Sequence, residues 1–263
     1  MTFPQIVLLF VAAVVGGTLN AVAGGGSFLT FPALIFVGVP PIQANATSTV
    51  AIWPGSVAST GAYRRELAQQ RRSLLYLMVG TSLIGGVLGA ILLLNTPAST
   101  FESLLPYLLL TATLLFTFSG QITATLHVRS IGKGRISPVR LIVLSVAQFI
   151  IAAYGGYFGG GIGILMLSTL AMMGIEDNIH VLNGLKTLLA SCINGVAVIT
   201  FIIARAVFWP QAILMIVGAI IGGYGGAYYA RKIDPRLVRY FVIAVGLAMT
   251  IYFFVRTYFL HIT

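Results

Sequence analysis

Lys186 is the residue of this 263-residue chain whose type and position point most clearly to chemistry. It lies about a turn inside a long apolar run, shortly after Asn183. An ionisable side chain inside a membrane segment is costly, so its presence there indicates a function. We interpret Lys186 as a binding residue for an anion. The alternative is that its long stem carries the ammonium group to the nearby headgroups.

Small amide and hydroxyl side chains stand at the start of two apolar runs. They supply hydrogen bonds without a fixed charge, which suits a site that must bind and release. They equally suit helix capping and contacts between helices, and both readings stay open. The candidate binding residues of these two segments are Asn45, Thr47, Thr49 and Asn183.

Two triglycine segments form the second kind of candidate site. Each glycine destabilises a helix by about 1 kcal/mol relative to alanine, so the segments should free backbone groups at membrane depth. The freed N–H groups and the N-terminus of a following helix can hold an anion, and close helix packing is the alternative. The candidates are Asn20, Gly24, Gly25, Gly26, Ser27, Gly159, Gly160 and Gly161.

Apolar runs of about span length supply the elements that would position these residues. The runs are long enough to cross a bilayer core of about 30 Å. Two shorter runs, at 27–38 and 162–174, cover only part of it and are expected as half-helices. Eight candidate spans are expected at 3–23, 44–63, 74–95, 101–119, 140–158, 182–204, 207–229 and 237–256.

The two halves of the chain repeat each other. Gly24 to Gly26 matches Gly159 to Gly161 at an offset of 135 residues, and Asn45 matches Asn183 at 138. The fold expected is an all-α polytopic membrane protein with two inverted repeats, each of four spans plus one short re-entrant half-helix. The first repeat covers 1–125, a cytoplasmic linker 126–139, and the second repeat 140–263.

The distribution of charge gives the expected orientation. The segment 64–72 is rich in arginine, whereas its second-half counterpart near 205–210 has one basic residue; the charges after 95 and after 230 are reversed. Placing the cationic loops in the cytoplasm inverts the two halves. Both termini then lie outside the cytoplasm, and the protein is expected in the inner membrane.

Composition excludes several classes of protein. Apolar residues make up 58% and charged residues 8% of the chain, far from a soluble balance, and the net charge of +10 lies in short loops. We therefore expect a lipid bilayer around the protein and no nucleic-acid partner. No acid–base pair or metal cage can be assembled, so neither an enzyme nor a cofactor is expected.

Further residues are assigned structural roles. The sets Gly85-Gly86-x-x-Gly89 and Gly222-Gly223-x-x-Gly226 are predicted to let helices approach closely. Trp53 and Trp209 are predicted to anchor the chain at the membrane interface.

The chain resembles the TauE/SafE family of sulfite exporters over essentially its whole length. The matching stretches are Leu19 to Ser27, Phe31-Pro32-Ala33-Leu34, Ala44 to Ala51, Trp53-Pro54-Gly55, Gly155 to Gly163, and Leu185-Lys186 through Asn194. The resemblance implies transport of sulfite or a small organosulfonate, with a site between the Gly24 and Gly159 turns, and Asn194 is a further candidate binding residue.

The expected function is export of a small anion, with sulfite or an organosulfonate as the first expectation, across the inner membrane by alternating access between the halves. A channel-like pore and a scaffold subunit without transport are the alternatives. The sequence leaves open whether the protein forms a homo-oligomer and which ion, if any, is coupled to transport.

Overall fold

The computed structural model describes residues 1–23, 25–127, 138–172, 179–229 and 235–259, and in these ranges the chain is helical and contains no strand. An α-helix satisfies its own backbone polar groups, which is why apolar runs fold this way. The elements are α1 (Phe3–Ala23), α2 (Ser27–Phe36), α3 (Pro41–Ala62), α4 (Arg64–Ala68), α5 (Arg72–Asn95), α6 (Ala98–His127), α7 (Pro138–Tyr157), α8 (Ile162–Met172), α9 (Ile179–Ile203), α10 (Trp209–Tyr229), α11 (Pro235–Phe254) and the π-helical turn η1 (Val255–Phe259).

Six segments of the described chain are long and apolar enough to cross a membrane. They are Phe3–Asn20, Arg72–Asn95, Ala98–Phe118, Pro138–Tyr157, Val181–Ile203 and Tyr240–Phe259. The two other predicted spans fall on α3, whose sequence is rich in small polar residues, and on α10, whose apolar stretch is described as Trp209–Gly223. The prediction of an all-helical, multi-pass membrane protein is confirmed, with six candidate spans in place of eight.

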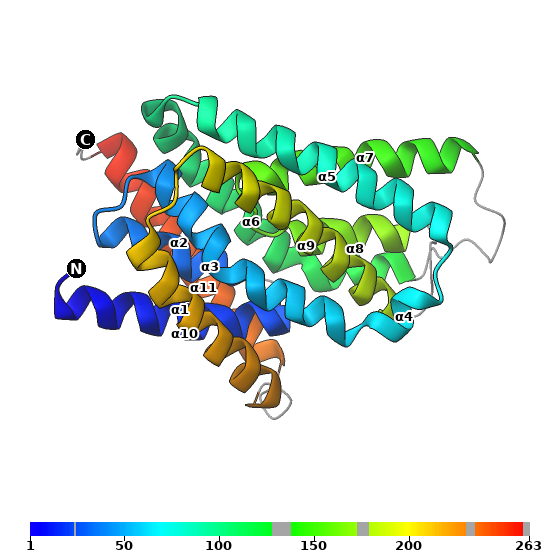
Figure 1. Ribbon diagram of the computed structural model, residues 1–263, viewed down its shortest axis with the longest axis horizontal. Coiled ribbons are helices and arrows are strands. Elements are labelled where there is room, and N and C mark those ends of the chain that lie inside the picture. Colours follow the sequence, from blue (N-terminus) through cyan, green and yellow to red (C-terminus); the bar gives the residue numbers. More distant parts are fainter. Residues whose placement is uncertain (24, 128–137, 173–178, 230–234, 260–263) are drawn as a thin grey trace.

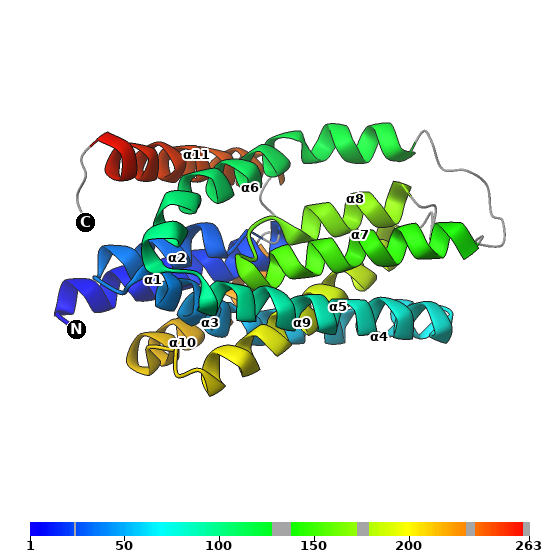
Figure 2. The ribbon, with the colours of Figure 1, turned by 90° about the horizontal axis from the view of Figure 1, so that it is seen from above.

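The two short apolar runs form the short helices that the sequence predicts. α2 has 10 residues and α8 has 11. At about 1.5 Å per residue, each covers roughly half of a bilayer core. Figures 1 and 2 show α2 toward the end of the molecule where α1 begins, and α8 toward the opposite end.

The helices of the two halves pack in a reciprocal pattern. The most extensive pairs are α1 with α10 and α5 with α7. When α1, α2, α3, α5 and α6 are matched in order with α7, α8, α9, α10 and α11, exchanging the halves converts one of these pairs into the other. The same exchange converts α5–α9 into α10–α3, and it leaves α3–α9 and α6–α11 unchanged.

Glycines close both of the extensive pairs. A Cβ on Gly89 would overlap the Ala153 carbonyl, and one on Gly222 would overlap the Val14 carbonyl. Gly85 and Gly86 are enclosed by α7 and α9 in the same way. The predicted packing role is therefore confirmed for these four glycines, because small residues let backbones approach closely.

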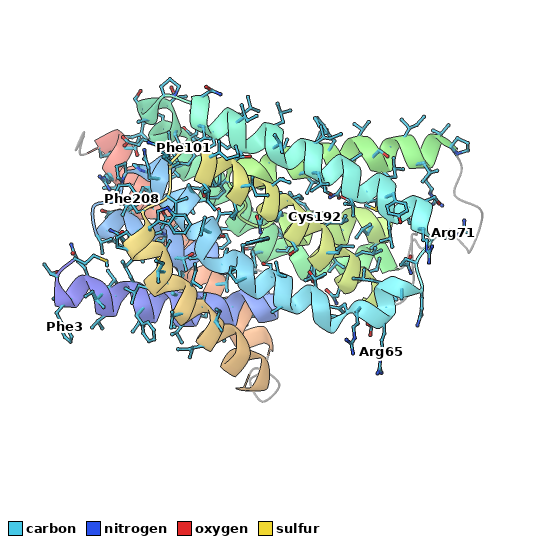
Figure 3. The ribbon with its side chains drawn as sticks, viewed as in Figure 1. Phe3, Arg65, Arg71, Phe101, Cys192 and Phe208 are labelled. Carbon is cyan, nitrogen blue, oxygen red and sulfur yellow. The ribbon has the colours of Figure 1, made fainter. Side chains whose placement is uncertain are left out.

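The ends of the bundle differ in charge. Phe3 lies at one end and Arg65 and Arg71 at the other (Figure 3). The segment expected as a loop after α3 contains the one-turn helix α4, whose Leu67 N–H donates to the Tyr63 carbonyl. η1 lies at the Phe3 end, so the described C-terminal turn and the start of the chain share one end (Figure 1).

Candidate functional site

The two glycine breaks meet on one helix in the interior of the bundle. A Cβ on Gly25 would touch the Phe116 ring of α6, and a Cβ on Gly160 or Gly161 would touch Ala112 of the same helix. Ala112 and Phe116 are four residues apart, which is one helical turn and about 6 Å along the axis of α6. Gly25, Gly26, Gly160 and Gly161 are buried, while Gly24 lies outside the described residues.

The second break requires glycine for its backbone conformation. Gly159 has φ +79° and Gly161 has φ +76°, which are left-handed values that side-chain-bearing residues rarely adopt. The chain therefore reverses here and starts α8 within a few residues. In the first break the requirement is one of space, because a Cβ on Gly26 would collide with the Gly16 carbonyl of α1.

Asn45 is tied to the second break, although it belongs to the first half. Its side chain is 3% exposed, and Nδ2 donates to the Tyr157 carbonyl at 3.0 Å. Tyr157 is the last residue of α7, whose final carbonyls have no partner inside their own helix. Asn45 thus closes the end of α7 beside the break, and this contact links the halves.

The other first-half candidates are also engaged by the protein. The Thr47 hydroxyl accepts from the Phe208 N–H at 3.1 Å, and the Thr49 hydroxyl donates to the Asn45 carbonyl at 2.9 Å. Asn20 donates from Nδ2 to the Ser56 hydroxyl at 3.3 Å. Ser27 is the partly buried first residue of α2.

Lys186, a residue of α9, packs against the second short helix, α8. The nearest heavy atom to a Cβ built on Gly163 would be Cδ of Lys186, so the lysine stem packs on the side-chain-free surface at the start of α8. The ammonium Nζ donates to Asn183 Oδ1 at 3.0 Å. The Thr187 hydroxyl donates to the Asn183 carbonyl at 2.7 Å. The structure therefore brings Lys186, Asn183 and the second break together.

The electrostatics of this arrangement favour an anion. The partner that the structure gives the ammonium is a neutral amide oxygen. The positive end of the α8 dipole, which starts at Ile162, adds to the positive potential there. An oxyanion between Lys186 and the start of α8 would be attracted by both.

Asn194 and Trp53 lie further along the α3–α9 contact. Asn194 is partly buried, about two turns beyond Lys186 on α9. Trp53 does not anchor the membrane interface: its Nε1–H donates to the Ser191 carbonyl at 3.0 Å, and its ring covers Gly195. This prediction is wrong because a glycine on α9 opens space for the indole inside the bundle. Trp209, 46% exposed at the start of α10, keeps its predicted position at a helix end.

A buried amide was missed by the sequence reasoning. Gln148 on α7 is 0% exposed and donates from Nε2 to the Ser82 hydroxyl of α5 at 2.8 Å. It stands in the middle of an apolar run, as Lys186 does. The same criterion, a polar side chain inside a predicted span, could have found it.

Comparison with known proteins places the chain in a family. The model of the sulfite exporter TauE/SafE family matches residues 9–253, so the chain belongs to that family. It is 28% identical to a probable membrane transporter protein of Sinorhizobium over 95% of this chain and 93% of the relative. It is 26% identical to such proteins of Haemophilus influenzae, over 93% and 92%, and of Escherichia coli, over 92% and 87%. No solved structure matches it.

The protein is therefore a multi-pass membrane transporter rather than an enzyme, as predicted.

Proposed function

We propose that this transporter exports a small anion, sulfite or an organosulfonate, across the inner membrane. The observation that carries the proposal is the position of Lys186, partly buried against the start of α8 with a neutral amide as hydrogen-bond partner. The family name and the charge-assisted hydrogen bonds that an ammonium group forms with oxyanions support a sulfur oxyanion.

The proposed mechanism is alternating access between two inverted repeats. The reciprocal packing of α1–α10 and α5–α7 supports it, as does the meeting of both glycine breaks on α6. Such repeats place a substrate site near the bilayer midplane, where helices break. In this mechanism the two halves rock about the α3–α9 and α6–α11 contacts and expose Lys186 to one side at a time.

The distribution of arginines supports the proposed direction of transport, from the cytoplasm to the outside. The end with Arg65 and Arg71 is assigned to the cytoplasm and both termini to the outside. An inside-negative potential then favours exit of an anion by about 2.3 kcal/mol per charge per 100 mV. Export of an anion can use this field without a further coupling site.

The test is counterflow in proteoliposomes with labelled sulfite. The unmodified protein is expected to exchange labelled for unlabelled sulfite, and Lys186→Met to reduce the rate at least about a hundredfold, because removal of the charge leaves an anion in low dielectric without its counter-charge. Ser48→Ala, at the equivalent position of α3, is the control and is expected to keep exchange, because Thr30 retains its hydrogen bond to the Gly26 carbonyl. Lys186→Met protein that inserts correctly and exchanges at the unmodified rate would remove the anion-binding role of Lys186.

The same vesicles separate the other two functions. A channel-like pore conducts without accumulating label against a gradient, whereas a carrier shows counterflow. A scaffold subunit gives no flux with any of sulfite, sulfate, thiosulfate, sulfoacetate or acetate. If flux is seen but with none of the sulfur compounds, the sulfur assignment fails while transport stands.

A further inference from the structure

Gln148 has a hydrogen-bonding group that the protein leaves unused. Nε2 is satisfied by Ser82, but Oε1 is buried and has no hydrogen-bond partner. A buried acceptor without a partner is destabilising, and native proteins contain few of them. Such an atom calls for an explanation, and a ligand is one.

Packing does not require a polar pair at this place. The repeat offsets of 135 and 137 residues match Gln148 with Ala13 and Ser82 with Ala219. Ala13 and Ala219 are buried in the α1–α10 contact, the counterpart of the α5–α7 contact that holds Gln148. Two alanines thus suffice in the equivalent helix pair, so the amide and the hydroxyl are specific to the α5–α7 contact.

The register of the helices puts Gln148 and Lys186 at matching positions of α7 and α9. A Cβ on Gly155 of α7 would touch Ile193 of α9, and Gln148 and Lys186 each precede these residues by seven positions, or two turns, on the same helix face. α7 and α9 run in the same direction through the bundle (Figure 1).

The surrounding side chains agree with this register. Leu144 and Ile151 flank Gln148 on its face of α7, and Leu185 and Leu189 flank Lys186 on α9. All four belong to one buried apolar cluster. Gln148 and Lys186 are therefore each flanked by residues of this one cluster.

We propose that Gln148 is a second substrate-contacting residue, whose Oε1 accepts a hydrogen bond from the part of the substrate remote from its anionic group. This inference rests on the proposed function of Lys186 and names the substrate class more closely: a small oxyanion that also bears a hydroxyl or other hydrogen-bond donor. Lys186 binds the anionic group, and Gln148 selects for the donor.

A matched pair of sulfonates tests the assignment. Binding of 2-hydroxyethanesulfonate and ethanesulfonate to the purified full-length protein is measured by calorimetry. The unmodified protein is expected to bind the hydroxylated compound about tenfold more tightly, because only that compound satisfies the buried oxygen. In Gln148→Leu, which conserves volume in an apolar cluster, the ratio is expected to fall to about one with ethanesulfonate affinity unchanged.

Two further variants separate the outcomes. Lys186→Met is expected to abolish binding of both compounds. The double variant Ser82→Ala, Gln148→Ala copies the alanine pair of the α1–α10 contact and replaces Gln148→Leu if that protein does not fold. A ratio near one in the unmodified protein, or a tenfold ratio that survives loss of Gln148, overturns the role of Gln148 alone. Absence of binding by both sulfonates, or binding that survives Lys186→Met, overturns the proposed sulfonate site and this inference with it.

Discussion

The starts of α3 and α9 are built alike and used differently. Both carry Asn-x-x-x-Thr, and in each the threonine hydroxyl donates to the asparagine carbonyl one turn before. In α3, Asn45 closes the end of α7, and Ser48 shares a 2.6 Å hydrogen bond with Thr30 of α2. In α9, Lys186 replaces that serine and pairs only with its neighbour Asn183 in the contacts described.

The difference teaches that two helix starts of similar sequence can serve different tasks. In the first half the polar groups hold helices together. In the second half Lys186 pairs with a neutral amide, and Gln148 Oε1 is buried without a hydrogen-bond partner; both are proposed to contact the substrate. Similar sequence at two helix starts therefore does not imply that both contact the substrate.

The largest effect on stability is expected in the α5–α7 and α1–α10 contacts, which are built alike. Gly89→Ala is expected to lower the free energy of unfolding by about 2–3 kcal/mol, because the new methyl group overlaps the Ala153 carbonyl. Gly222→Ala should have a similar effect through Val14. Denaturant unfolding in detergent micelles measures both.

Gly80→Ala is the control within α5, since a Cβ there has no neighbour within 4 Å. It should be neutral or stabilising by up to about 1 kcal/mol. Equal effects of Gly80→Ala and Gly89→Ala would contradict the close approach of α5 and α7.

A smaller effect on stability is expected at Asn45, and it distinguishes Asn45 from Asn183. Asn45→Ala is expected to destabilise by about 1–3 kcal/mol, because the Tyr157 carbonyl is left without its partner next to the second break. Asn183→Ala should cost less than about 1 kcal/mol in stability and reduce sulfite exchange instead, since its partner is Lys186. Thermal unfolding measures the stability of both variants, and counterflow measures their sulfite exchange. The comparison fails if Asn183→Ala is the less stable variant and Asn45→Ala the one with reduced exchange.

The smallest effect concerns two helix ends of the same kind. Gly38, at φ +87°, lies two residues after the end of α2, and Arg205, at φ +54°, lies two residues after the end of α9. A hydrogen bond between residues five positions apart closes each end. Arg205→Gly is expected to stabilise the protein by about 0.5–1 kcal/mol, because glycine adopts this conformation without steric strain. Gly38→Ala should destabilise by a similar amount. A rise in melting temperature for both variants would exclude this explanation.

Sequence reasoning recovered the elements well because apolar runs in lipid have few alternatives to the helix. It located both short helices and the glycines that close α5–α7 and α1–α10. It did not foresee α4, and it assigned Trp53 to the membrane interface, because the glycine that accommodates the indole lies 142 residues away, at Gly195. It also left open whether Asn45 binds a ligand or joins helices.

The sequence by itself determined the class of this protein: helices of span length, two short helices after glycine breaks, and one lysine inside an apolar run. These features are local, since they depend on the transfer of each segment from water to lipid. Only the tertiary structure decided which polar groups are already satisfied. Asn45 finds its acceptor 112 residues away, whereas Gln148 keeps one oxygen free, and such pairings depend on which helices meet.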